Sequence, residues 1–448
     1  MTLLLKKILV YILTLESRLI LAKYKPFIIA VTGSVGKTST KDAIYSVIKR
    51  QSKHARKSEK SLNSEIGLPL TIIGAPNAWH SLSGWLKNIM TGFELILWRA
   101  EYPDCLVLEL GADHPGDIRR VASWLKPDVA VITRVSQTPV HVEFFPTPDD
   151  VFKEKSALAY AVKKGGTVVL FADEEKMLTL VTPLREAGIN VKTFGLNQSA
   201  DVRGSEYAPM YAEQELASPT LPGPIVRTLV GMSFVMNVES TAVPVTVSGA
   251  LGATYMYPLL AAATVGRARA MPVGEITEGC MEYHVPPGRM NVVPGVNGSI
   301  IVDDSYNSSP DAVDAALEAL RGLECAGRKI VAFGDMMELG KYASDEHKKM
   351  GKAAAVSAQL FVTVGPRTKT SAAPEAVVAG MKAEDVLSFD SSQQAADYLL
   401  PLVRQGDVIL VKGSQSMRME RICSTLLRYP EKAATLLVRQ EKEWLEKK

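Results

Sequence analysis

The sequence predicts an α/β protein that has a doubly wound central sheet domain of the P-loop type and, after it, a Rossmann-like α/β domain. Short apolar runs alternate with helical patterns along the chain, for example at 105–111, 128–133 and 165–170. This alternation is typical of a parallel sheet covered by helices on both faces. The 448 residues, of which 47% are hydrophobic and 22% charged, are enough for two or three domains with separate cores.

The central sheet begins with the segment 28–40, IIAVTGSVGKTST. Residues 28–31 read as a buried strand, the next residues turn the chain sharply, and a helical pattern begins at Ser39. Gly33 and Gly36 allow backbone N–H groups to approach phosphate oxygens, Lys37 can reach the terminal phosphates, and the Thr38 hydroxyl can bind magnesium. A strict phosphate-loop pattern would need glycine at position 31, so this is a shortened T-G-x-x-G-K-T variant. We expect a nucleoside triphosphate on Gly33, Ser34, Val35, Gly36, Lys37, Thr38 and Ser39; the alternative is a plain turn.

Composition excludes few other classes of protein. The formal net charge of +3 gives no reason to expect nucleic acid, because a binding domain would carry a clustered basic excess. The four cysteines, Cys105, Cys280, Cys325 and Cys423, lie far apart and form no C-x-x-C pair, so neither a zinc site nor a disulfide framework is predicted. A reducing cytoplasm is the expected location.

The first 25 residues read as an amphipathic helix. Charged residues interrupt the apolar stretch 3–21, so it contains too few consecutive apolar residues to span a membrane. No small-residue cleavage site follows it, so it does not read as a signal peptide. A helix lying on a membrane surface and a helix packed on the next domain both fit this pattern. A second amphipathic helix is predicted at 79–98, with an aromatic face that belongs either to the core or to a membrane-facing surface.

Candidate metal ligands follow the apolar strands. The strand at 105–111 contains Glu109 near its end, where ligand chemistry collects in parallel sheets, so Glu109 is a candidate magnesium ligand. His141 lies in the loop after strand 128–133, and a helix is predicted at 148–162. From 201 to 247 short alternating strands predict an antiparallel appendage. A second α/β unit begins near 286, with strands at 299–304, 329–334, 359–365 and 407–412 and a helix at 311–323.

Eight motifs occur in a fixed order between about Pro26 and Arg421. They are TGSVGKTST, SLNSEIGLP, LELGADHPGDI, HVEFF with EKSAL, PPGRM, DDSYNSSPDA, FGDMMELG and VKGSQSMRME. Each is weak alone, but the set resembles the Mur ligases, and most of all their branch that adds D-alanyl-D-alanine to a UDP-N-acetylmuramoyl-tripeptide. With the N-terminal helix at 1–25, the resemblance divides the rest of the chain into a central ATP-binding domain at 26–285 and a C-terminal domain at 286–448.

The resemblance implies an ATP-dependent amide ligase that works through an acyl phosphate in peptidoglycan synthesis. Its cofactors would be ATP and Mg²⁺, and its partners a muramyl-peptide or related carboxylate acceptor and a dipeptide amine donor. Carried over by position, Lys37 and Thr38 hold phosphate and magnesium, Glu109 and His141 ligate magnesium, and Lys155 matches the family's carbamylated lysine. A free ammonium would repel a metal ion, whereas a carbamate is an anion that can bind one.

The resemblance also places part of the nucleotide site in the C-terminal domain. Arg289 and Asp304 match the family's inter-domain nucleotide contacts, and Tyr306 and Asn307 complete that motif. Lys412, on the last matched strand, would face the acyl phosphate. For Tyr306 and Asn307 a simple turn before a helix that begins near Ser309-Pro310 remains an alternative.

The chain departs from the family pattern in two ways. Only residues 1–25 precede the central domain, where the family has a whole UDP-binding domain, so we expect a different mode of acceptor recognition, such as a lipid-linked or membrane-proximal substrate met by the N-terminal helix. The family's H-N-x-x-N motif near the ATP base is also altered, with Thr254, Tyr255 and Pro258 here, and Phe171 replaces the asparagine before Asp173 and Glu174. We therefore expect triphosphate chemistry with altered base contacts.

Two other functions stay open. Folylpolyglutamate synthases share the two larger domains and also lack the UDP-binding domain, although DDSYNSSP and FGDMMELG favour the cell-wall branch. The chain could instead be a non-catalytic homologue that binds nucleotide and docks on the membrane. The joint presence of Lys37, Thr38, Glu109, His141 and Lys155 argues against that scaffold. The expected location is the cytoplasm; the alternative is a cytoplasmic protein in peripheral contact with the inner face of the membrane.

Overall fold

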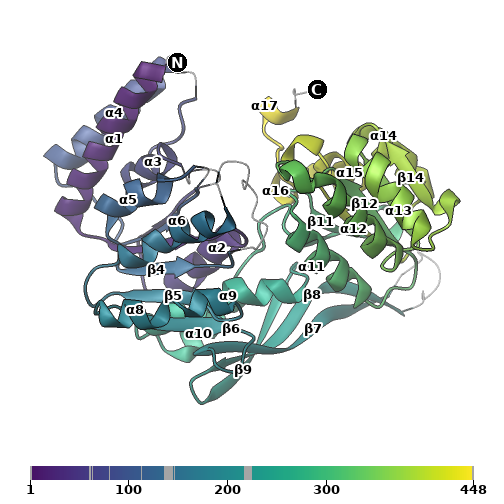
Figure 1. The fold of residues 1–448 in the computed structure, drawn as a ribbon, viewed down its shortest axis with the longest axis horizontal. Coiled ribbons are helices and arrows are strands. Elements are labelled where there is room, and N and C mark those ends of the chain that lie inside the picture. Colours follow the sequence, from purple (N-terminus) through teal and green to yellow (C-terminus); the bar gives the residue numbers. More distant parts are fainter. Residues whose placement is uncertain are drawn as a thin grey trace.

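The computed structural model describes residues 3–59, 62, 64–79, 81–112, 114–135, 145, 147–215 and 225–445. These residues form two β-sheets, a nine-stranded one and a six-stranded one, with helices packed around both (Figure 1). The prediction of a mixed α/β fold built on parallel sheets is confirmed.

The larger sheet combines a parallel part and an antiparallel part. In spatial order its strands are β2 (Ala55–Lys57), β3 (Cys105–Glu109), β1 (Phe27–Thr32), β4 (Val129–Ile132), β5 (Thr167–Phe171), β6 (Asn190–Gly195), β7 (Val202–Glu215), β8 (Ile225–Val238) and β9 (Thr241–Ser248). Pairing is parallel from β2 to β7 and antiparallel from β7 to β9. β3 and β4 are buried along their whole length, as strands with helices on both faces must be.

This sheet differs from the sequence analysis in two details. The region 201–247 was expected to form an antiparallel appendage of short strands. Its antiparallel pairing is confirmed, but β7 and β8 have 14 residues each, and β7 continues the main sheet by pairing with β6. The edge strand β2, which pairs with β3, was not predicted. The three residues of β2 show no strand pattern of their own, so the formation of β2 depends on its pairing with β3.

Helices cover the larger sheet on both sides. They are α2 (Lys37–Ile48), α3 (Gly67–Ile73), α5 (Asp117–Leu125), α6 (Pro148–Tyr160), α7 (Glu175–Leu178), α8 (Val181–Glu186), α9 (Met256–Ala268) and α10 (Val273–Met281). The start of α6 is encoded locally, because the Thr147 side chain accepts a hydrogen bond from the Asp150 N–H and Pro148 occupies the first turn. α2 packs closely on α9, which fixes the helix that follows the glycine-rich loop.

Two further helices, α1 (Leu3–Tyr24) and α4 (Leu82–Leu97), lie side by side at one end of the molecule (Figure 1). They run parallel, since Lys23 at the end of α1 donates to the carbonyls of Leu95 and Ile96 at the end of α4. The Tyr24 ring stacks on Tyr102 with centroids 4.5 Å apart, which joins α1 to the start of β3. Among the described residues, neither of these helices nor any other is long and apolar enough to span a bilayer.

The smaller sheet follows with strand order β10 (Asn291–Pro294), β11 (Ile300–Asp304), β15 (Val408–Lys412), β12 (Lys329–Gly334), β13 (Leu360–Val364) and β14 (Val386–Phe389). Its helices are α11 (Pro310–Arg321), α12 (Ala343–Ala355), α13 (Ala373–Val378), α14 (Ser392–Leu399), α15 (Glu420–Leu426), α16 (Ala433–Leu436) and α17 (Lys442–Leu445). Only β10 is antiparallel to its neighbour. The four strands and the helix predicted after position 286 are all present, whereas the short edge strands β10 and β14 were not foreseen.

Candidate functional site

The glycine-rich loop connects β1 to α2, as the sequence predicts. Gly36 adopts φ 83° as the residue before α2, a left-handed conformation that favours glycine. Gly33 has φ 151°, and a Cβ atom there would lie 1.9 Å from the Thr133 hydroxyl oxygen at the end of β4. The end of the neighbouring strand therefore requires glycine at position 33.

The end of β4 also holds the loop in place. The N–H groups of Ser34 and Val35 donate to the Arg134 carbonyl, with N–O distances of 2.8 and 3.3 Å, and the Thr133 hydroxyl donates to the Val35 carbonyl. The Lys37 ammonium lies back over the loop and donates to the carbonyl of Gly33 at 2.9 Å. The Lys37 side chain therefore already lies across the glycine-rich loop.

The structure brings Thr38 and Glu109 together. The Thr38 hydroxyl donates to a Glu109 carboxylate oxygen at 3.2 Å, because β1 and β3 are adjacent parallel strands that end at the same edge. The buried Lys41 ammonium lies 3.8 Å from the other Glu109 oxygen and donates to the Ser58 carbonyl. Lys41 and Ser58 were missed from the sequence; the only signal was that Lys41 follows Lys37 by one helical turn.

A hydroxyl and a carboxylate side by side are the hard oxygen ligands that Mg²⁺ prefers, so Thr38 and Glu109 fit the predicted metal. Lys155 is buried on α6, with 5% of its surface exposed, and α6 packs on β1 and β4. His141 lies outside the described residues. Within the described ranges, no group of three or more His, Cys, Asp or Glu side chains is arranged to hold a metal ion.

A second cluster forms at the carboxyl ends of β11 and β15. The Lys412 ammonium lies 2.6 Å from an Asp304 carboxylate oxygen and also donates to the Asn307 carbonyl at 2.9 Å. The Arg289 guanidinium stacks over the Tyr306 ring, 4.1 Å from its centroid. The five residues predicted in the C-terminal half are therefore neighbours, and Lys412 is engaged with Asp304 and Asn307.

Burial governs the electrostatics of this cluster. It raises the pKa of Asp304 above its ordinary value, although the nearby charges of Lys412 and Arg289 act in the opposite direction. Burial also raises the pKa of Asp303 to about 6, against the hydrogen bond that Asp303 accepts from the Ser305 N–H. The ion pair with Lys412 is therefore what compensates the charge of a carboxylate enclosed by protein.

Two residues of this cluster were not predicted. Asp303 accepts hydrogen bonds from the N–H groups of Gly288 and Ser305, at 3.0 and 3.1 Å, and so fixes the turn that carries Arg289. Arg439 donates to the carbonyls of Ser305 and Tyr306. The Asp303-Asp304 doublet was visible in the sequence, but successive strand residues face opposite sides, and the pattern does not say which side carries the site.

Tyr255 connects the two halves. It lies in a short 3-10 turn at Ala253–Tyr255, is 7% exposed, and donates from its hydroxyl to the Arg289 carbonyl. Burial raises the pKa of Tyr255, and the charge of Asp304 adds to the effect, whereas Arg289 and the nearby Ser39 oppose it. Ser39, directly after Thr38, and Arg289 therefore meet around one buried phenol.

Arg134 forms another connection between the halves. Its guanidinium lies 3.6 Å from Glu174, which follows β5 and precedes α7, and 3.7 Å from Asp311 in α11. Since the Arg134 carbonyl also anchors the glycine-rich loop, this residue joins the loop, the end of β5 and the second unit.

Phe171, one of the altered positions near the expected base site, packs against an aromatic neighbour. The Tyr257 ring meets the Phe171 ring edge-on, with centroids 4.8 Å apart. Asp173 accepts hydrogen bonds from the N–H groups of Leu196 and Asn197, so it holds the turn after β6. The replacement of asparagine by Phe171 thus has a physical partner in Tyr257.

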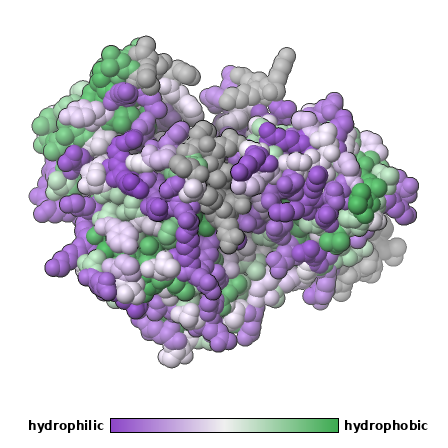
Figure 2. All heavy atoms as spheres, viewed as in Figure 1, coloured by the Kyte–Doolittle hydropathy of each residue, from purple (hydrophilic) through white to green (hydrophobic). Residues whose placement is uncertain are grey.

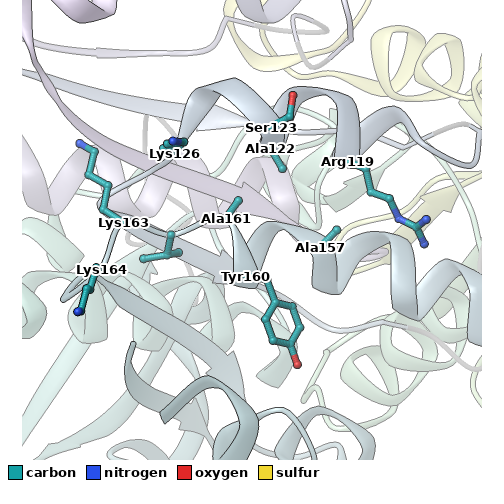
Figure 3. Close-up of a pocket in the computed structure, with 10 residues that line it drawn as sticks. Arg119, Ala122, Ser123, Lys126, Ala157, Tyr160, Ala161, Lys163 and Lys164 are labelled. Carbon is teal, nitrogen blue, oxygen red and sulfur yellow. The ribbon is translucent and has the colours of Figure 1, made fainter. Parts of the chain in front are cut away.

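A separate surface pocket lies between α5 and α6 (Figure 3). Its lining includes Arg119, Lys126, Lys163 and Lys164. Lys126 precedes β4 and Lys163 precedes β5, so the pocket lies at the amino ends of these strands, at the opposite edge of the sheet from the glycine-rich loop. It is therefore not the nucleotide site.

Comparison with known proteins agrees with this architecture. Residues 87–243 match the Mur ligase middle domain, and residues 288–415 match the Mur ligase, glutamate ligase domain. The UDP-N-acetylmuramoyl-tripeptide--D-alanyl-D-alanine ligase of Bacillus subtilis is 25% identical over 404 residues, which cover 90% of this chain and 76% of the relative.

Solved structures give the same result. The MurF ligase of Thermotoga maritima in complex with ADP superposes with a TM-score of 0.74 and 25% identity, covering 95% of this chain and 84% of that chain. A folylpolyglutamate synthase from Thermotoga maritima shares the fold, with a TM-score of 0.57, 13% identity and coverage of 96% and 94%. With two Mur ligase domains that together match more than half of its length, the chain belongs to the Mur ligase family.

Proposed function

We propose that this protein is an ATP-dependent amide ligase that adds D-alanyl-D-alanine to a UDP-muramoyl-tripeptide in peptidoglycan synthesis. The observation that carries the proposal is the meeting of two half-sites: the loop with Lys37, Thr38 and Glu109, and the cluster that contains Arg289 and Asp304. They approach each other around Tyr255, as a site that closes on a nucleotide between two domains requires. The relatives that are named for this reaction align with about nine tenths of this chain.

The loop side would hold the triphosphate. Its backbone N–H groups and the start of α2 supply positive electrostatic potential, and Lys37 supplies a full charge that can move from the Gly33 carbonyl to a phosphate oxygen. Lys37 also neutralises charge on the transferring phosphoryl group, which matters because two anions must approach each other. Ser34 and Val35 donate to Arg134 here, so phosphate binding would exchange that carbonyl for phosphate oxygens.

Thr38 and Glu109 would hold Mg²⁺, with Lys155 as a further ligand if its amine carries a carbamate, and His141 as the fourth predicted one. The metal ion, when bound, neutralises phosphate charge and orients the triphosphate. Lys41 beside Glu109 keeps that carboxylate in place from the opposite side. The domain limits predicted from the sequence, 26–285 and 286–448, divide these groups between the two half-sites.

The reaction itself needs few protein groups. An acceptor carboxylate oxygen takes the γ-phosphoryl group and ADP leaves; the amine of the dipeptide then attacks the acyl carbon, loses a proton, and phosphate leaves. Arg289, stacked on Tyr306, would contact the nucleotide from the C-terminal side. Lys412 lies between Asp304 and the Asn307 carbonyl, so we propose that it first orders this cluster and reaches the acyl phosphate only when the site closes.

Base recognition differs from the family pattern in this proposal. Tyr255 donates a hydrogen bond to the Arg289 carbonyl, and Tyr257 packs on Phe171. Neither side chain offers the amide or imidazole groups of the family's H-N-x-x-N motif. We expect weak discrimination between ATP and GTP. A competition assay with the two nucleotides measures it, and a preference for ATP of more than about a hundredfold would contradict this expectation.

The test of the ligase is magnesium-dependent phosphate release from ATP with D-alanyl-D-alanine and UDP-muramoyl-tripeptide, added singly and together. Release only with both supports the proposal. Release with a folate and glutamate instead would establish the folylpolyglutamate-type alternative. If ATP binds but no pair of substrates gives phosphate release, the non-catalytic alternative is favoured. In that case Lys37→Ala would leave the biological function intact.

A further inference from the structure

The pair of helices α1 and α4 carries a hydrophobic surface that the ligase reaction does not use. More than half of the large hydrophobic side chains that are exposed among the described residues lie on these helices and their flanks. Figure 2 shows hydrophobic side chains gathered over this end of the molecule. Exposed hydrophobic side chains that are gathered in one patch, and not scattered singly, mark interaction sites.

The exposed residues form one stripe on each helix. The α1 stripe consists of Leu4, Ile8, Tyr11, Leu15 and Leu19, at steps of three and four residues. The α4 stripe has the same spacing and consists of Leu82, Leu86, Met90, Phe93 and Leu97. Such steps keep the side chains on one face of a helix. Since Lys23 and Tyr24 fix the ends of the helices side by side, the two stripes form a two-helix apolar face.

The opposite faces of both helices already have partners within the protein. Leu9, Leu13 and Ile20 of α1 are buried, as are Trp85 and Gly92 of α4. The exposed stripes are therefore not the sides by which the helices attach to the fold, and covering them would require something outside the described chain.

The borders of the apolar face are basic. Exposed lysine and arginine side chains flank the stripes at Lys7 and Arg18 on α1 and at Lys87 on α4. A second basic group adjoins the end of α1, where Arg18 and Lys25 line one pocket together with Lys126 and Lys163. The neighbouring acids are fewer: Glu94 and Glu101 are exposed, whereas Glu65 is paired with Lys6.

Tryptophan residues mark the two ends of the α4 stripe. Trp79 is 74% exposed and Trp98 is 64% exposed, although both are large apolar side chains. Tryptophan is enriched where protein meets the headgroup region of a bilayer. Leucine-rich helix faces with basic borders and terminal tryptophans are typical of helices that lie in this interface.

We propose that the α1–α4 face docks this protein on the surface of an anionic lipid bilayer. The basic border selects this occupant over a second copy of the chain, because two copies would bring their cations together, whereas anionic headgroups would neutralise them. Docking does not depend on the proposed ligase activity, but it would hold the catalytic units close to a membrane.

The experiment is flotation of the full-length protein, without nucleotide, with vesicles of neutral phosphatidylcholine or of phosphatidylcholine containing about 30% phosphatidylglycerol, an anionic fraction that gives the surface a clear negative potential. We expect flotation with the anionic vesicles, at least tenfold weaker binding to the neutral ones, and partial loss at high salt. Leu86→Ser with Phe93→Ser should reduce binding at least tenfold. The matched control is Val377→Ser with Val378→Ser, which removes two exposed side chains of α13.

Charge is tested in the same assay. Lys7→Glu with Arg18→Glu should abolish the preference for anionic vesicles, while Lys348→Glu with Lys382→Glu, two exposed lysines of the other unit, should not. Three results would overturn the proposal: no flotation of the wild type, equal flotation of Leu86→Ser/Phe93→Ser, or a wild-type dimer that ignores vesicles and becomes monomeric in that variant. Phosphate release is assayed separately, so failure of docking is distinguishable from failure of the ligase.

Discussion

Replacing Lys412 by methionine tests how the C-terminal half of the site is held together. Methionine keeps the length and apolar stem of lysine but removes the charge that lies 2.6 Å from Asp304. Both side chains are enclosed, with 2% and 10% of their surfaces exposed, so the Asp304 carboxylate would stay buried without its main partner. Breaking a buried ion pair in this way costs about 3–5 kcal/mol. Arg289 and the Met290 N–H still face Asp304, so we expect the lower end, about 3 kcal/mol.

The double variant tests the ion pair more directly than either single change. Asp304→Asn alone should also cost about 3 kcal/mol, because the Lys412 ammonium would keep only the Asn307 carbonyl. Lys412→Met with Asp304→Asn removes both charges and should cost roughly 2 kcal/mol, well below the sum of the two single changes, since paired groups are not additive. Lys329→Met is the control, since Lys329 lies on the neighbouring strand β12 with an exposed ammonium; we expect a change of less than about 0.5 kcal/mol.

The assay is native-state hydrogen exchange of the amides in β11 and β15, which reports the free energy of opening for this sheet alone. The pH dependence has a definite sign. Burial raises the pKa of Asp304, and loss of Lys412 raises it further, so the folded variant binds a proton that the unfolded chain releases. The loss in Lys412→Met should therefore be smallest below the unfolded pKa of aspartate, near pH 4, and grow as the pH rises. A loss under about 1 kcal/mol at neutral pH, or strict additivity in the double variant, would refute this reasoning.

Three other changes test the remaining parts. Gly33→Ala should abolish ATP binding, measured by calorimetry, because a Cβ atom would lie 1.9 Å from the Thr133 hydroxyl oxygen and displace the loop. Glu109→Gln should weaken the magnesium dependence of phosphate release at least tenfold, because an amide replaces the carboxylate beside Thr38. Glu16→Gln should raise the stability of the protein at pH 8 by roughly 1–2 kcal/mol and change it little at pH 4.5, because burial raises the pKa of Glu16 to about 7.

Each of these has a control and a contradicting result. Gly274→Ala places the same methyl group at a glycine with open space and no left-handed backbone conformation. If Gly274→Ala lost ATP binding as Gly33→Ala does, the steric argument would fail. For Glu109→Gln, an unchanged magnesium titration would exclude Glu109 as a ligand, with Glu101→Gln as the surface control. For Glu16, whose carboxylate has no hydrogen-bond partner among the described residues, equal stabilisation at both pH values would mean that charge burial is not the cause.

Local patterns in the sequence predicted the parts of the fold that depend on neighbouring residues. The loop at 32–38 followed from two glycines between an apolar run and a helix, and β12 was predicted with its observed limits, Lys329–Gly334. The closeness of Thr38 and Glu109 also followed, because parallel strands bring their carboxyl ends to one edge. What failed was the extent of β7 and β8, since their length depends on pairing with each other and with β6 and not on a local residue pattern.

The contacts that join the two half-sites could not be predicted for the same reason. Tyr255 donates to Arg289, 34 positions away, and Arg134 reaches Asp311 in α11, so neither contact has a signature at any fixed spacing. Lys41 could not be distinguished from other helix lysines until β2 placed Ser58 beside it. A helix was predicted in the first 25 residues and is present as α1, but its parallel packing on α4 required the structure.

The most direct test of the central claim is detection of the amide product. The purified protein would be incubated with ATP, Mg²⁺, D-alanyl-D-alanine and UDP-muramoyl-tripeptide, and the products analysed by mass spectrometry. We predict a UDP-muramoyl-pentapeptide in amounts equal to the ADP and phosphate released, and no product with Lys37→Ala. A folded wild-type protein that binds ATP but forms no such amide from these two substrates would contradict the account.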